Sequence, residues 1–118
     1  MKHIALLALA ASLLLGCSGD DSGGPNPPPP PPPDAASVSM IVGTPPKFLP
    51  SLVTVAAGGT VTFTNNSPGD HNVVSSTNVW PQTLVSPDET FALTLAQPGS
   101  YPYTCTIHPG MNGTITVK

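Results

Sequence analysis

Apolar and polar side chains alternate with a period of two from residue 37 to the end of the chain, and helical spacing is absent. Val61 and Phe63 alternate with threonines, and Phe91, Leu93 and Leu95 alternate with small or polar residues. Such alternation puts one face of a strand in a core and the other in solvent. The pattern predicts seven strands, at residues 37–42, 51–56, 60–65, 72–75, 90–96, 101–105 and 114–117.

Turn-forming residues separate these predicted strands. Gly58 and Gly59 form one break, and the segments 65–69, 86–88 and 97–99 combine proline or glycine with small polar residues. Many short strands at this spacing are typical of a sandwich of two sheets. We therefore expect an all-β fold, a two-sheet Greek-key β-sandwich, in one small domain at residues 34–118.

The N-terminus has the features of an export signal. Lys2 is followed by an apolar run at residues 4–15, which is shorter than the roughly 20 residues that a membrane-spanning helix needs. The run ends in Leu14-Leu15-Gly16-Cys17, which resembles the lipobox of bacterial lipoproteins. That resemblance implies a signal peptide at residues 1–16 and a lipidated Cys17 as first residue of the mature protein. In the alternative, an ordinary signal peptide is cut nearby and Cys17 is incidental.

Residues 17–33 would then form a lipidated N-terminus and a proline-rich tether. The stretch 25–33 is almost entirely proline, and at ~3.1 Å per residue an extended polyproline helix of this length measures about 28 Å. We expect it to hold the domain off a membrane on the periplasmic or cell-surface side. Ser18 after the cysteine favours the outer membrane in a cell that has one, because it is not the aspartate that resembles an inner-membrane retention signal.

Charge excludes one large class of partners. The formal net charge is −3 and the isoelectric point is near 5.2, so there is no basic patch for a nucleic acid. Residues 34–118 carry only two lysines and four carboxylates. We expect a monomer that meets its protein partners through an apolar or weakly polar surface.

Four side chains carry the candidate chemistry. Cys105, His108 and Met111 are spaced Cys-x-x-His-x-x-Met, and His71 lies well upstream. A thiolate, two imidazoles and a weak axial thioether are the donors of a trigonal copper site that cycles between Cu(II) and Cu(I). Structural zinc prefers four strong donors, and a thioether is a poor fourth.

Each donor also has a simpler interpretation. Cys105 could be a small buried hydrophobe, His71 a loop histidine bonded to nearby backbone, and Met111 a core side chain. However, a lone thiol is unusual in an exported protein if Cys17 is lipidated and cannot pair with it. The combination of all four residues therefore favours a metal site over the separate readings.

The sequence around these residues resembles the cupredoxin family of type 1 blue copper proteins, nearest the plastocyanin, amicyanin and pseudoazurin group. The resemblance is carried by residues 47–50, 53–55, 59–65, 71–73 and 99–117, while the brief polar stretch 75–87 around Trp80 departs from the family pattern. It implies one copper ion held by His71, Cys105, His108 and Met111. It also implies that Asn72 joins the two ligand segments and that the edge of His108 reaches the surface. The residues around that edge would be Pro68, Gly69, Pro109 and Gly110.

We therefore expect an electron carrier that is not an enzyme. An oxidase or reductase would need further copper bound by further histidines, but the chain has only three, and His3 lies in the predicted signal. Copper storage or delivery is the alternative function, although carriers of that kind tend to have exposed clusters of methionine and histidine. The redox donor and acceptor are not identified by the sequence.

Overall fold

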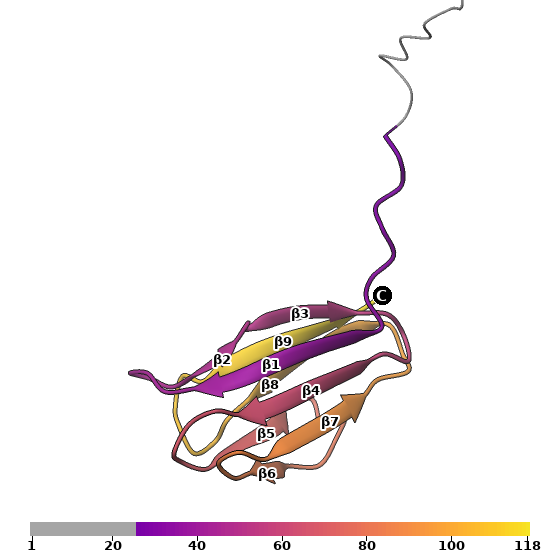
Figure 1. Cartoon of the computed structure of the whole chain (residues 1–118). Helices are drawn as coiled ribbons and strands as arrows, with labels where there is room; N and C mark the ends of the chain where they lie inside the picture. Colours follow the sequence, from indigo (N-terminus) through magenta and orange to yellow (C-terminus); the bar gives the residue numbers. More distant parts are fainter. Residues whose placement is uncertain (1–25) are drawn as a thin grey trace, which may run out of the picture.

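The computed structural model describes residues 26–118, which form nine strands. None of the described residues forms a helix long and apolar enough to cross a bilayer. The predicted signal peptide and Cys17 lie outside the described residues. The strands are β1 (Ala35–Ile41), β2 (Lys47–Leu49), β3 (Leu52–Val55), β4 (Thr60–Asn65), β5 (His71–Ser75), β6 (Thr83–Val85), β7 (Thr90–Thr94), β8 (Gly99–Thr104) and β9 (Asn112–Val117) (Figure 1).

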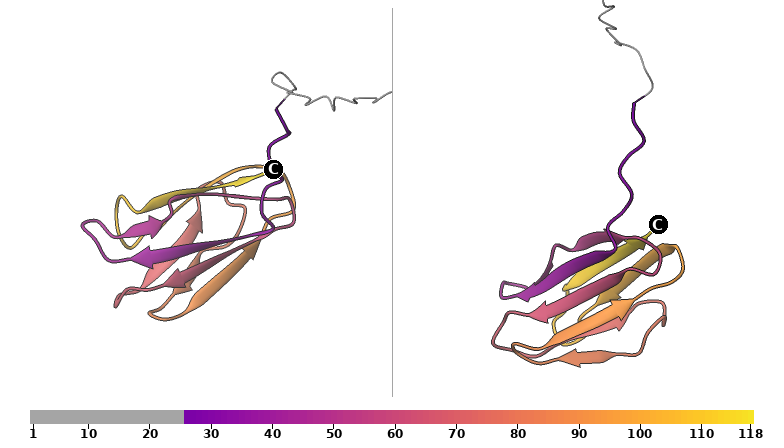
Figure 2. Two further views of the ribbon diagram at one scale, coloured as in Figure 1. Left: turned by 45° about the horizontal axis from the view of Figure 1, so that its top comes forward. Right: turned by 45° about the vertical axis from the view of Figure 1, so that its right-hand side comes forward.

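The strands form two sheets packed as layers, which Figure 2 shows from two further sides. One sheet has the order β2-β1-β4-β7 and the other the order β3-β9-β8-β5-β6. Both sheets are mixed, because β1 pairs with β4 and β3 with β9 in parallel, while the other pairs are antiparallel. The predicted all-β sandwich is confirmed.

Alternation places the core between the sheets, as the sequence predicts. Strand β4 buries Val61, Phe63 and Asn65 and turns its threonines outward. At the centre the Phe48 and Phe63 rings both pack edge-on against Tyr103, with centroids 4.8 and 5.2 Å away. Edge-to-face contacts at these distances are favourable for aromatic rings, and they tie β2, β4 and β8 together.

The sequence-based assignment missed two strands and misplaced several strand boundaries by one or two residues. Strands β2 and β6 have three residues each, too few to show a period of two. The predicted strand 101–105 actually begins at Gly99 and ends at Thr104, so Cys105 follows the strand and does not end it. The polar stretch 75–87 contains β6 and the buried Trp80, which is 8% exposed.

Strand β4 runs from one end of the sandwich to the other. At its start, Thr60 N donates to Asp34 O, and nearby Ala56 N donates to Pro33 O. At its other end, Asn65 leads into the loop before His71. Six strand residues span roughly 17 Å at ~3.3 Å per step. The proline segment therefore joins the domain at the end opposite His71 (Figure 1).

Candidate metal centre

His71 is the first residue of β5, where the chain re-enters the sheet after an exposed turn at residues 68–70. It pairs with Val85 of β6, and its side chain is only 2% exposed. Pairing on β6 and burial under the turn hold the imidazole in one place. A strand missed by the sequence analysis thus helps to position a predicted site residue.

Cys105 and His108 come from the loop between β8 and β9, and this loop closes on itself. Cys105 N donates to Met111 O at 2.9 Å, and Met111 N donates to His108 O at 3.2 Å. The hydroxyl of Thr104 adds a third bond, to Met111 O at 3.1 Å. These bonds bring Cys105, His108 and Met111 around one tight turn, with the Cys105 and Met111 side chains buried.

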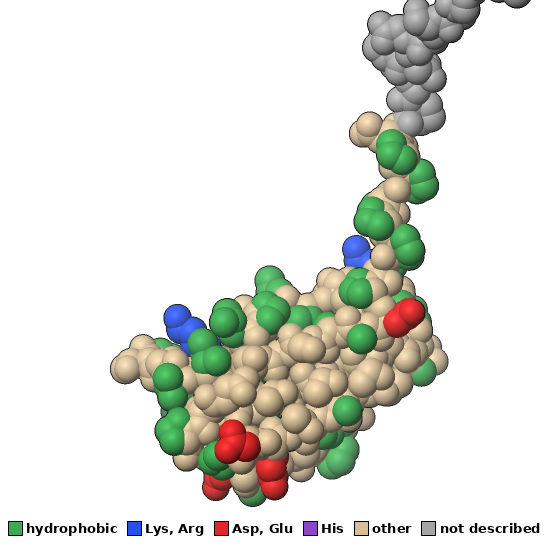
Figure 3. All heavy atoms as spheres, viewed as in Figure 1, with side chains coloured by type: hydrophobic (Ala, Val, Ile, Leu, Met, Phe, Trp, Pro, Cys, Tyr) green, Lys and Arg blue, Asp and Glu red, His purple; other side chains and the backbone are tan. Residues whose placement is uncertain are grey.

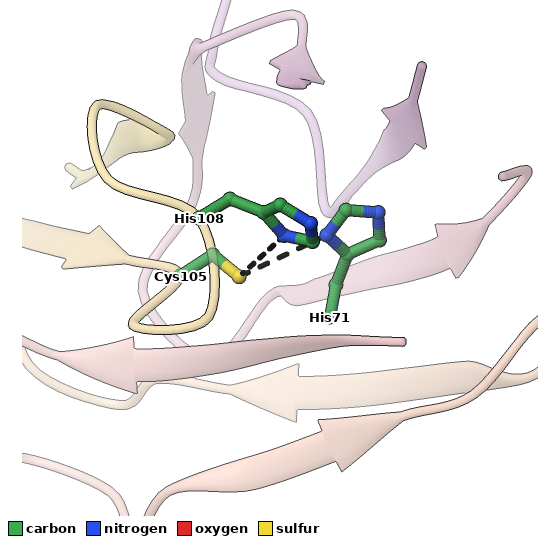
Figure 4. Close-up of side chains that lie close together, drawn as sticks. All are labelled: His71, Cys105 and His108. Atoms are coloured by element: carbon green, nitrogen blue, oxygen red, sulfur yellow. Dashed lines mark hydrogen bonds between the residues drawn. The ribbon is translucent and has the colours of Figure 1, made fainter. Parts of the chain in front are cut away.

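The two imidazole rings lie next to each other, and each turns a nitrogen toward the thiol (Figure 4). Nδ1 of His71 and Nδ1 of His108 each lie 3.8 Å from Sγ of Cys105, and the imidazole centroids are 4.6 Å apart. One donor atom from each of the three residues falls within 4.8 Å of the others. The structure therefore brings together three of the four predicted ligands around one point.

The environment of His71 keeps its imidazole neutral. Burial lowers the pKa of His71 below its ordinary value of 6.5, and the nearby His108 lowers it further, while Asp70 opposes both effects. Only a neutral imidazole has a nitrogen lone pair to offer to a metal. The site therefore favours the form of His71 that can act as a ligand.

Asn72 connects the two segments that carry the histidines. Its Nδ2 donates to Thr106 Oγ1 at 2.7 Å, and its Oδ1 accepts from Thr106 N at 2.8 Å. Asn72 itself is buried. The family resemblance implies that Asn72 joins the two ligand segments, and in the structure its side chain makes both bonds to Thr106.

Ser67 and Asn65 contact the centre from outside, and the sequence analysis did not identify them. Ser67 Oγ lies 2.7 Å from His71 Nε2, and the same hydroxyl lies 2.8 Å from Asn65 Oδ1. All three side chains are buried. The available signal was a serine in the turn four residues before His71, but serines are so common in turns that this position does not stand out.

The donors present fit a copper ion by their chemistry. One thiol and two imidazoles meet with no carboxylate in the cluster, and the buried Met111 thioether follows in the same loop. Soft sulfur with imidazole suits copper, whereas magnesium and calcium prefer oxygen ligands.

His108 lies at the rim of an open groove of about 180 Å³. The groove is lined by Val42, Gly43, Pro46, Ser67, Pro68, Gly69, His71 and His108. Of the surface residues expected beside His108, Pro68 and Gly69 line it, while Pro109 and Gly110 are exposed nearby on the loop. In the view of Figure 3 most of the surface is uncharged, and acidic side chains gather at the lower left edge of the domain.

Comparison with known proteins gives one consistent family. Residues 37–118 match the model for copper binding proteins of the plastocyanin/azurin family. The chain is 36% identical over 98 residues to plastocyanin from Prochlorothrix hollandica, covering 71% of this chain and 75% of that protein. It spans about half the length of the chloroplast plastocyanins that it matches from Physcomitrium patens and Hordeum vulgare.

Solved structures agree on the fold. The crystal structure of amicyanin from Paracoccus versutus superposes with a TM-score of 0.64 and 33% identity, covering 74% of this chain and 84% of that one. A copper-containing nitrite reductase from Thermus scotoductus superposes with a TM-score of 0.60 and 27% identity, over 71% of this chain. That match covers only 22% of the reductase.

Proposed function

This chain belongs to the plastocyanin/azurin family of copper binding proteins, and we propose that it is an exported, membrane-tethered carrier of single electrons with one copper ion. The observation that carries the proposal is the Cys105 thiol, which is 1% exposed and is faced by Nδ1 of His71 and of His108 at 3.8 Å each. This arrangement supplies soft and imidazole donors without an oxygen ligand.

Four side chains of this chain would hold the metal. Cys105, His71 and His108 would be the strong ligands and Met111 the weak fourth. Copper, when bound, supplies the Cu(II)/Cu(I) couple. The chain's own contribution is to fix the donors: His71 by its strand and its burial, and the other three by the hydrogen-bonded turn after β8. A site held in this way changes little between two charge states, which favours electron transfer.

Electrons would pass through the exposed edge of His108. Both histidines line the apolar groove, but the His108 side chain is half-buried whereas His71 is only 2% exposed. A partner with a complementary apolar surface could lie against residues 42–46 and 67–69 without removing strongly hydrated charges from water. We propose redox proteins as the donor and acceptor.

Among residues 26–118 the chain offers one such cluster of metal-binding side chains. Enzymes that transform a substrate at copper need a position for it, and here all four donors are committed to one centre. The likeness to a nitrite reductase covers a small part of that enzyme. We therefore propose that this protein carries electrons and is not itself an enzyme.

The tether would point the metal centre away from the membrane. Pro33 and Asp34 are bonded beside the start of β4, while His71 lies past its other end. The C-terminal Lys118 also lies by the proline segment. If lipid is attached at Cys17, the exchange surface would face outward, separated from residues 17–24 by a proline segment of about 28 Å and by the roughly 17 Å length of β4. A carrier in that position suits partners that stand clear of the anchoring membrane.

A copper titration tests the central proposal. Residues 17–118 carrying Cys17→Ser keep Cys105 as their only thiol, and one equivalent of Cu(II) should give an intense visible band that a mild reductant bleaches. The band should be absent from the same protein when it also carries the substitution Cys105→Ala. A protein that binds copper without colour would contradict electron transfer and support storage or delivery.

Fractionation tests the tether separately. In a bacterial host that exports and lipidates proteins, Cys17→Ser in the full chain should move the protein from the membrane fraction to the soluble fraction. Unchanged partitioning would refute the lipid anchor and leave the copper centre unaffected.

A further inference from the structure

A chain of buried hydrogen bonds runs from the end of β4 to the outer nitrogen of His71. It begins at Asn65, whose Nδ2 donates to Gly69 O at 2.8 Å and to Val85 O at 2.9 Å. Both partners are carbonyl oxygens, which only accept, so they fix which end of the Asn65 amide is nitrogen. Asn65 Oδ1 is thereby turned toward Ser67, whose backbone N donates to it at 3.0 Å.

The direction of the Ser67 hydroxyl follows from this arrangement. A serine hydroxyl has one proton to donate and two lone pairs that accept. Besides His71, its near neighbours are Asn65 Oδ1 at 2.8 Å and Gly69 O at 3.2 Å. Asn65 Oδ1 can only accept, and two oxygens 2.8 Å apart would repel without a proton between them, so the single proton of Ser67 goes to Asn65 Oδ1. What the hydroxyl oxygen offers to His71 is therefore a lone pair.

The Ser67 hydroxyl in turn determines which ring nitrogen of His71 carries the proton. Ser67 Oγ lies 2.7 Å from Nε2, and an accepting oxygen at that distance requires a proton on Nε2. In a neutral imidazole the other nitrogen, Nδ1, then carries the lone pair. That nitrogen is the one that lies 3.8 Å from Cys105 Sγ. We propose that Ser67 is a positioning residue that holds His71 as the Nε2-protonated tautomer and aims its Nδ1 lone pair at the metal centre.

The position of Ser67 gives the contact its strength. Its side chain is 7% exposed, and Asn65 and His71 are more deeply buried still, so water does not compete freely for these groups. A hydrogen bond to the outer nitrogen also raises the basicity of a metal-bound imidazole, and loss of such a partner typically costs 10–100-fold in metal affinity. Ser67 would thus act on the metal through His71 without touching it.

The first measurement uses the metal-free protein, so it does not depend on the proposed copper site. Long-range proton–nitrogen NMR spectra of residues 17–118 carrying Cys17→Ser report which ring nitrogen is protonated. We expect His71 to carry its proton on Nε2 alone. In Ser67→Ala the Nε2 proton loses its acceptor, so a mixture of tautomers should appear. Ser67→Thr keeps a hydroxyl and should restore the single tautomer.

The second measurement is the copper affinity of the same variants. Ser67→Ala should bind Cu(II) about 10–100-fold more weakly, and Ser67→Thr should recover most of the loss. A more basic imidazole stabilises Cu(II) more than Cu(I), so the reduction potential of Ser67→Ala should rise. The rise should be about 59 mV for each tenfold decrease in the ratio of the Cu(II) affinity to the Cu(I) affinity.

Ser39→Ala is the matched control. The Ser39 hydroxyl also bonds to an asparagine side chain, accepting from Asn66 Nδ2 at 3.1 Å, but at a partly exposed position of β1. It should change neither the tautomer nor the affinity. The proposal is overturned if wild-type His71 carries its proton on Nδ1, or if Ser67→Ala keeps the wild-type tautomer. If Ser67→Ala does not fold, a wild-type proton on Nδ1 would still overturn the proposal.

Discussion

The two histidines of the centre present the same nitrogen to the same sulfur, at the same 3.8 Å, from two very different regions. His71 lies in a segment, residues 65–72, where side chains of Asn65, Ser67 and Asn72 all make buried or partly buried hydrogen bonds. His108 lies in a loop, residues 105–111, that is held by its own backbone and is largely exposed between its buried ends.

The difference assigns the two regions different tasks. The buried segment has few alternative arrangements, because each polar group within it would lose a partner on moving. The exposed loop can lie against another protein, because its groups already face solvent. In the proposed electron carrier, His71 would thus fix the metal geometry and His108 would exchange electrons. The following changes should separate these tasks, from the largest expected effect to the smallest.

Replacing each histidine by glycine should have the largest effect, and it should show that the two histidine positions differ in their access to solvent. Either change removes a strong ligand, so both His71→Gly and His108→Gly should lose the visible band of the copper protein. Added imidazole should restore the band in His108→Gly, since that position borders an open groove. Restoration should be weaker in His71→Gly, because the His71 ring also lines that groove but is only 2% exposed. Equal restoration of the band in both variants would contradict the difference in exposure between the two histidine positions.

A methyl group added at Gly113, in β9 just after the loop, should be the next most destabilising change. A Cβ at Gly113 would lie 2.3 Å from Cζ and from the hydroxyl oxygen of Tyr103, and that ring is fully buried. Overpacking of this kind costs about 1–3 kcal/mol or more, so Gly113→Ala should lower the denaturation midpoint clearly. Gly69→Ala in the turn before His71 is the control, because a Cβ there meets nothing within 4 Å. A similar loss in both variants would exclude the clash as the cause.

Removing the connection between the two regions should have a moderate effect. Asn72→Ala loses both bonds to Thr106, at about 1–2 kcal/mol for the pair. The Thr106 amide should then exchange its hydrogen faster, while amides of β4 should be unaffected. Thr106→Ala loses the hydroxyl bond but keeps the amide bond, and it should lie between wild type and Asn72→Ala. An unchanged exchange rate at residue 106 would show that other contacts hold the loop.

The smallest effect should come from Tyr103→Phe. In the described part of the chain the Tyr103 hydroxyl is buried without a hydrogen-bond partner, so its removal should change stability at neutral pH by less than about 1 kcal/mol.

The same variant should remove a pH dependence. Burial raises the pKa of Tyr103 above its ordinary value of 10.0, so above that pH the unfolded chain releases a proton that the folded chain retains. Wild-type stability should therefore fall as the pH rises past 10 in a way that Tyr103→Phe does not. Denaturant midpoints at neutral and alkaline pH measure this. Parallel pH profiles for the two proteins would refute it.

Some of these features follow from the sequence alone. The period of two from residue 37 onward predicts strands, and seven of the nine strands are found close to the predicted positions. The spacing of Cys105, His108 and Met111 also predicts a shared site, because a short turn leaves them little freedom to separate. Alternation and short-range spacing are local properties, so the sequence determines them by itself.

The tertiary structure decided how His71 is held. The strand that pairs with its segment has three residues, too few for a recognisable pattern, and Asn65 and Ser67 are ordinary turn residues until the fold buries them. Their roles arise because β4, β5 and β6 bring carbonyl oxygens of residues 69 and 85 to one amide. The sequence thus determined the donors and the strands. Their protonation and their burial depend on contacts between distant residues, which only the folded chain creates.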